Sequence, residues 1–120
     1  MGGDVGNASE SHILKVTDYE ISLGCRQEGI KGKVETRPTL ILKGRPLLGN
    51  AKTALLRGSL DAQLRAPLYN AKAKHIEFFF PFEIWPTYLE LVQSESQLYV
   101  HFSQRENGSL FATLTTARSL

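Results

Sequence analysis

Cysteine is nearly absent from this chain of 120 residues, which carries it only at Cys25. A lone cysteine excludes an internal disulfide. It is also typical of proteins that work in a reducing compartment, so we expect a cytoplasmic location. A domain of this length can bury a sufficient core without disulfides or a structural metal, and the ordinary apolar and charged fractions agree with one such domain.

Long apolar runs and targeting signals are also lacking. No run reaches the length that spans a membrane, and residues 1–11 carry neither a basic patch nor an apolar segment. Their Gly, Ser and Asn content predicts a disordered leader, followed by a single β domain over residues 12–118. The phosphate-binding patterns GxGxxG and GxxxxGK followed by Ser or Thr are absent. We therefore expect no membrane association and no cofactor.

Aromatic residues are concentrated in one stretch, residues 75–86, which holds five of the eleven in the chain. The alternate positions 76, 78, 80, 82 and 84 are all apolar, which is the pattern of a strand with one buried face. Phe79 and Trp85 fall on the opposite face. Because a buried aromatic side chain stabilises a fold by about 2–3 kcal/mol, we predict that this strand lies at the centre of the core.

Strand-type alternation recurs along the rest of the chain. In residues 12–23 the phase slips near Thr17 and Asp18, which predicts either a bulge or two short strands. In residues 33–43, Pro38 favours an edge position or a break. Residues 53–65 alternate most cleanly, and residues 97–105 and 110–116 flank Asn107-Gly108, a strong hairpin turn. Gly and Pro predict loops over residues 25–32, 44–50 and 66–74.

Residues 87–93 allow two interpretations. Leu89 and Leu91 would share one face of a strand, whereas Pro86 would begin a short helix that carries Leu89 and Val92. We favour the strand, because Thr, Tyr and Val suit it and the surrounding pattern is β. The chain as a whole predicts an all-β fold, an antiparallel sandwich or partly open barrel of about seven strands with a C-terminal meander.

No group of residues in the sequence predicts catalysis. Cys25 has no histidine base near it in sequence, and His75 with Glu77 offers only two of the ligands that a metal needs. Glu77 and Glu83 would lie about 20 Å apart on a strand, too far to flank one bond. We therefore predict no catalytic residue and no metal site, and we rank a small enzyme of unknown type third among the functional hypotheses.

The favoured hypothesis is a non-enzymatic binding or interaction module. Its surface or pocket would lie around residues 79–88 and receive an apolar small molecule or a protein partner. Three large aromatic side chains there exceed what one core can hide, namely Phe79, Trp85 and Tyr88.

The alternative is binding to nucleic acid or another polyanion, although it is not the hypothesis we favour. Residues 26–74 hold eleven basic and three acidic residues, while the segments on either side are acidic. Clustered basic residues attract polyanions when folding brings them onto one face. The candidate contacts are Lys31, Lys33, Arg37, Lys43, Arg45, Lys52, Arg57 and Arg65.

A homodimer is a further hypothesis, because the aromatic strand carries apolar groups on both faces. Phe79 and Trp85 should not face water uncovered, and Pro81 favours a sheet edge that needs protection. A two-fold contact would cover both features. In the alternative, Leu68 and Tyr69 of the loop over residues 66–74 cover this face within the monomer.

Overall fold

The computed structural model describes residues 8–27, 29–32, 34–59, 64–94 and 97–116. Within them the chain is mostly β, as predicted, and the strands form one seven-stranded sheet in the order β4-β5-β3-β2-β1-β6-β7. The elements are β1 (Ala8–Gln27), β2 (Val34–Leu48), β3 (Thr53–Ser59), β4 (Leu68–Asn70), β5 (His75–Pro81), the 3-10 turn η2 (Phe82–Ile84), α1 (Trp85–Ser94), β6 (Tyr99–Arg105) and β7 (Leu110–Thr115).

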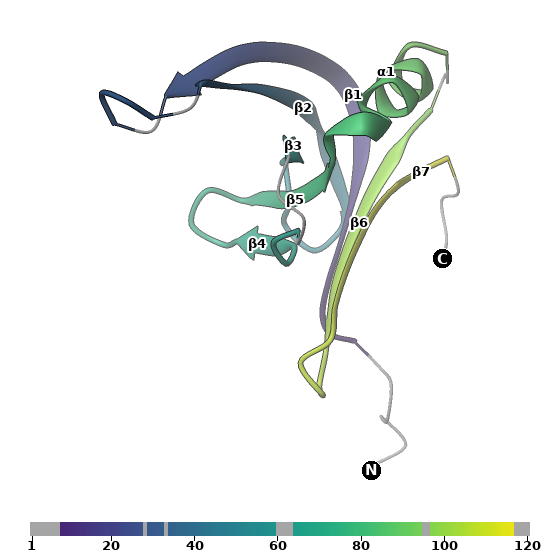
Figure 1. Cartoon of the computed structure of the whole chain (residues 1–120). Coiled ribbons are helices and arrows are strands. Elements are labelled where there is room, and N and C mark those ends of the chain that lie inside the picture. Colours follow the sequence, from purple (N-terminus) through teal and green to yellow (C-terminus); the bar gives the residue numbers. More distant parts are fainter. Residues whose placement is uncertain (1–7, 28, 33, 60–63, 95–96, 117–120) are drawn as a thin grey trace.

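The sheet curves around its own inner face and is consistent with a partly open barrel. Neighbouring strands are antiparallel except β3 and β5, which run parallel because the chain crosses over through β4 between them. Figure 1 shows β3, β4 and β5 on one side and β6 and β7 on the other, with α1 beside the upper part of β6. None of the helices in the described residues is long and apolar enough to cross a membrane.

The strand β1 belongs to both halves of this sheet. Its first part pairs with β6 as far as Lys15, and its residues from Ile13 onward pair with β2. The register shifts between Val16 and Asp18, which confirms the bulge predicted there. At this bend β2 passes so close to β1 that a Cβ on Gly44 would lie 1.8 Å from the Lys15 carbonyl oxygen, so only glycine fits.

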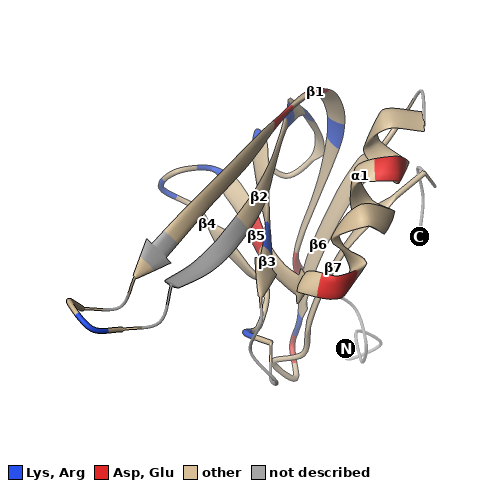
Figure 2. Ribbon diagram, turned by 45° about the horizontal axis from the view of Figure 1, so that its top comes forward, with Lys and Arg blue, Asp and Glu red and all other residues tan. Residues whose placement is uncertain are grey.

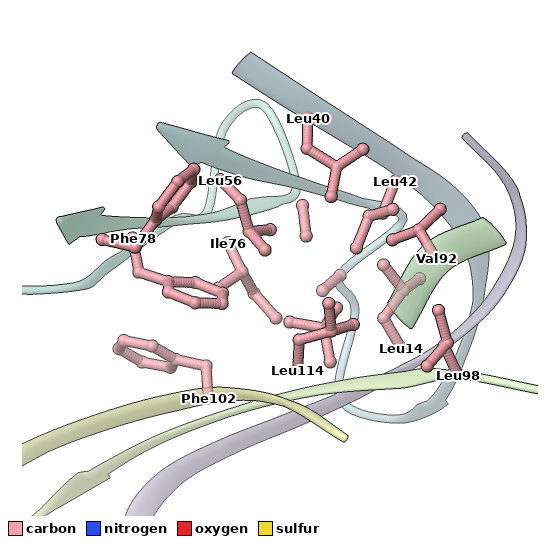
Figure 3. Packing of buried hydrophobic residues seen from close by; sticks show 14 residues of the cluster. Leu14, Leu40, Leu42, Leu56, Ile76, Phe78, Val92, Leu98, Phe102 and Leu114 are labelled. Atoms are coloured by element: carbon pink, nitrogen blue, oxygen red, sulfur yellow. The ribbon is translucent and has the colours of Figure 1, made fainter. Parts of the chain in front are cut away.

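The core lies between the two halves of the sheet. Figure 3 shows Leu56, Ile76 and Phe78 from β3 and β5 facing Phe102 and Leu114 from β6 and β7. Val92 of α1 packs against the same cluster. Of the five inward positions predicted for the aromatic strand, 76, 78 and 80 are buried, which confirms the period-two register there, whereas 82 and 84 belong to η2, which has no buried residue.

Several predicted boundaries are wrong. The favoured strand over residues 87–93 is a helix, α1, whose first turn contains Pro86, as the alternative interpretation had it. The aromatic strand accordingly ends at Pro81, where its pairing with Ser59 of β3 also ends.

Other predicted loops and ends differ in extent. The loop over residues 44–50 is mostly strand, because β2 runs to Leu48, and the loop over residues 66–74 contains β4. Residues 8–11 of the predicted leader belong to β1. Residues 1–7, and residues 60–63 of the predicted strand over 53–65, lie outside the described part.

Candidate functional site

The structure separates the three aromatic residues that the sequence grouped into one site. Trp85 and Tyr88 pack from the helical segment onto Phe80 on the inner face, with ring centroids 5.9 and 4.6 Å from that of Phe80. Burial raises the pKa of the Tyr88 hydroxyl. Phe79 lies on the outer face, where the Arg65 guanidinium sits 5.8 Å from its ring centroid. Trp85 and Tyr88 thus complete the core, and Phe79 belongs to another surface.

The basic residues of the polyanion hypothesis are dispersed, as Figure 2 shows. Two of them have acidic partners on the outer face: Lys43 Nζ lies 2.6 Å from Glu20, and Arg57 Nε donates a 3.0 Å hydrogen bond to Glu77. The Glu20 hydrogen bond raises the pKa of Lys43. Lys31, Arg45, Lys52 and Arg65 are exposed on separate segments, Lys33 lies outside the described residues, and the side chain of Arg37 is not described.

Two histidines make structural contacts. The His12 ring, 4% exposed, stacks on Tyr69 at 3.7 Å, and its Nδ1 accepts a 3.0 Å hydrogen bond from the Asn50 backbone N–H. These contacts join β1 to β4 and to the β2–β3 turn. His101 Nε2 lies 3.2 Å from Ser11 Oγ on the outer face, and burial lowers the pKa of His101.

Neither histidine lies in a recognisable catalytic or metal-binding arrangement. Within the described residues, His101 Nδ1 has no partner to orient the imidazole beside Ser11, as the third member of a triad would. No group of three potential metal ligands occurs in the same part of the chain.

The feature that sequence reasoning missed is an unpaired edge of β1. The last described backbone bond between β1 and the β6 side runs from Val16 N–H to the Leu98 carbonyl, 3.0 Å, and the Gln97 side-chain amide bonds the Val16 carbonyl. Beyond Val16, the pairing described for β1 is with β2 alone. We call residues 17–27 the free edge. Figures 1 and 2 show this part of β1 projecting with β2 as a two-stranded hairpin, its tip directed away from α1.

Apolar side chains line the inner face of the free edge. Tyr19, Ile21 and Leu23, which we call the apolar shelf, lie at alternate positions and are 38%, 39% and 67% exposed. Their neighbours on β2 are buried: Leu42 opposite Tyr19, Leu40 opposite Ile21, and Pro38 opposite Leu23. Apolar side chains that are buried on β2 are therefore continued on β1 by apolar side chains that are partly exposed.

The alternation of the apolar shelf is visible in the sequence, but its exposure could not be predicted from it. In the sequence Tyr19, Ile21 and Leu23 occupy alternate positions, which is the expected pattern of a buried strand face. Whether such a face is covered depends on which strand pairs next to it. Here β6 begins at Tyr99, opposite Lys15, and so does not extend beside the free edge, which no local sequence pattern reveals.

Comparison with protein-family models, with curated proteins and with solved structures finds no match to this chain. The functional inference therefore rests on the geometry of the free edge and the apolar shelf.

Proposed function

We propose that this protein is a non-enzymatic interaction module that receives an extended segment of a protein partner along the free edge of β1. The observation that carries the proposal is the coincidence of an unpaired strand edge with three partly exposed apolar side chains on one of its faces. Cys25, a free and exposed thiol on the same strand, suits the cytoplasmic location that we also propose.

The physical basis is strand addition. An unpaired strand presents backbone N–H and C=O groups that a second extended chain can bond, and the side chains at alternate positions select the partner. Proteins ordinarily protect such edges with charges, bulges or covering segments. The apolar shelf does not protect the free edge in this way, because its three side chains place partly exposed apolar surface beside the unpaired backbone groups.

The geometry favours this edge over the aromatic segment. A ligand at Trp85 and Tyr88 would have to compete with their packing on Phe80, which is itself 1% exposed. The apolar shelf can be covered by a partner without disturbing any described contact of the core. A partner segment should carry apolar residues at every second position, because only one face of the added strand meets the shelf.

Selection from a library of random peptides tests the proposal. Enriched peptides should show period-two apolar patterning, and Leu23→Asp should abolish their binding. Ile30→Asp is the matched control, because Ile30 is 94% exposed in the β1–β2 turn and lies off the edge. With the protein dilute enough to be monomeric, failure to enrich any peptide, or peptides that bind Leu23→Asp as well as the wild type, would contradict strand addition at this site.

Polyanion binding is the second candidate, and one observation favours it. Arg57 lies opposite Phe79 in the β3–β5 register, and Arg65 lies over the same ring, so two cations flank a partly exposed aromatic on the outer face. Aromatic rings between basic side chains are typical of surfaces that stack nucleic-acid bases. The hydrogen bond from Arg57 to Glu77 weakens this candidate, because it neutralises one of the cations.

Heparin chromatography at low salt tests the second candidate. A polyanion-binding protein should be retained and should elute as salt rises, and Arg57→Glu combined with Arg65→Glu should abolish retention. Lys72→Glu is the charge control, because Lys72 is exposed in the turn between β4 and β5 and is not one of the candidate contacts. Wild-type protein that flows through the column would exclude polyanion binding.

A further inference from the structure

We infer that the occupant of the free edge is a second copy of this chain, paired antiparallel with the first about a two-fold axis at Ser22. The inference rests on the proposed function, because it names the partner that the same edge receives. This antiparallel pairing would join the sheets of the two copies into one continuous sheet through β1 of each copy.

The extent of the free edge gives this register. The edge covers residues 17–27, and Ser22 is its midpoint. A two-fold axis at Ser22 therefore pairs the whole free edge of one copy with the whole free edge of the other. The pairing stops short of Lys15, where β6 already occupies the same side of β1. A register displaced toward the start of β1 would drive the hairpin of one copy into β6 of the other.

The side-chain pattern fits the same register. Directly opposed residues of an antiparallel pair point to the same face of the sheet. About Ser22, Ile21 lies opposite Leu23 of the second copy, and Tyr19 opposite Cys25. The two apolar shelves thus form one surface on one face. A slip of one residue would place the two shelves on opposite faces, so the pattern selects the register.

Charge also favours the antiparallel arrangement. The first part of the free edge carries two exposed acidic residues, Asp18 and Glu20. Parallel pairing in register would set each carboxylate beside the same carboxylate of the second copy, which is destabilising. The two-fold register about Ser22 instead places Glu20 opposite Gly24 and keeps the acidic residues of the two copies apart.

This interface differs from the dimer predicted from the aromatic strand. Phe79 and Trp85 lie on different faces, so one contact cannot cover both. β5 pairs with β3 along its full length and with β4 over residues 75–77. Residues 17–27 of β1 offer the longer unpaired edge among the described strands.

Sedimentation equilibrium at micromolar concentration measures the oligomeric state. The wild type should have twice the monomer mass of 13.4 kDa. Leu23→Asp should raise the dimer dissociation constant by about tenfold or more, since a buried interface contact of this kind is worth that much. Ile30→Asp should remain dimeric, and the circular dichroism of both variants should match that of the wild type.

Cysteine cross-linking tests the register. With Cys25→Ser as the background, Ser22→Cys places the two thiols at the axis, and mild oxidation should yield a covalent dimer. Thr39→Cys in the same background is the matched control, because Thr39 lies opposite Ser22 on β2 and away from the edge. Equal cross-linking of the two variants would overturn the register.

The outcomes separate this inference from the proposed function. A monomeric wild type that still binds selected peptides through Leu23 would overturn the second copy and leave strand addition in place. A monomer that binds no peptide would overturn both. A dimer that persists unchanged in Leu23→Asp would overturn the inference, because its interface would lie elsewhere.

Discussion

Phe80 is the side chain on which the aromatic residues of β5 and the helical segment converge. It is buried, stacks on Trp85, contacts Tyr88 and lies beside Gly58, whose missing side chain leaves room for the Phe80 ring and Pro38. Phe80→Ala should lower the free energy of unfolding by about 3–5 kcal/mol, because it leaves a cavity between sheet and helix. Urea denaturation measures this change.

Ile30→Ala is the control for that substitution, since its side chain is almost fully exposed. It should change the free energy of unfolding by less than about 0.5 kcal/mol. Equal effects of the two substitutions would show that Phe80 does not occupy the core.

His101 should make stability depend on pH. Burial lowers its pKa below the ordinary value of 6.5, so the folded state disfavours the charged imidazole. Above 6.5 this histidine is neutral in both states and its contribution is fully present. As pH falls from there through the lowered pKa, the unfolded chain binds the proton first and stability is lost.

Denaturant midpoints at several pH values between 7.5 and 5 test this prediction. The decline should be smaller in His101→Gln, which keeps a polar group beside Ser11 without titrating. An identical pH profile for the variant would assign the decline to other groups.

Much of the inward-facing pattern could be predicted at the residue scale. Ile76, Phe78 and Phe80 are buried as their alternation predicted, because successive strand side chains must point to opposite faces. Exposure could not be predicted in the same way. Ile21 and Leu23 alternate just as regularly, yet they are exposed because β6 does not extend beside them.

At the scale of elements, the bend shared by β1 and β2 depends on a missing side chain. A Cβ on Gly44 would meet the Lys15 carbonyl oxygen and carbon and the Val16 Cα, all of them backbone atoms that cannot rotate away. Gly44→Ala should therefore cost about 1–3 kcal/mol or more of stability, as overpacking does.

Gly24→Ala is the matched control for the bend. Gly24 also lies in β1, and a Cβ there would meet no atom within 4 Å. Its denaturation midpoint should stay at or slightly above that of the wild type, because alanine lowers the entropy of the unfolded chain. A Gly44→Ala variant as stable as Gly24→Ala would show that the two strands do not approach so closely.

The helix α1 shows why element type was less predictable than strand alternation. Residues 87–93 are compatible with both periods, so local pattern alone could not decide. Val92 is buried in the core while Trp85, Tyr88 and Leu91 pack against it, at spacings of three and four residues. Tertiary packing against the sheet thus selects the helix over the weak strand preference of the same residues.

At the scale of the whole molecule, the connections of the sheet should make folding slow. Ser11 and His101 share a contact although 90 residues separate them in sequence, and β3 pairs in parallel with β5 across a crossover. Sheets dominated by such distant pairings fold in roughly milliseconds to seconds. Stopped-flow refolding followed by Trp85, the only tryptophan, should show this timescale. Refolding completed within microseconds would contradict it.

The dual pairing of β1 also bears on synthesis at the ribosome. The first part of β1 is made early, but its partner β6 is added only after β2, β3, β4, β5 and α1. Until then residues 8–15 of β1 have no strand on the edge that β6 pairs, whereas β2 can already pair with the other edge from Ile13 onward. The nascent chain therefore passes through a long interval in which β1 is unpaired along the whole of one edge, and during that interval this edge can pair wrongly with neighbouring chains.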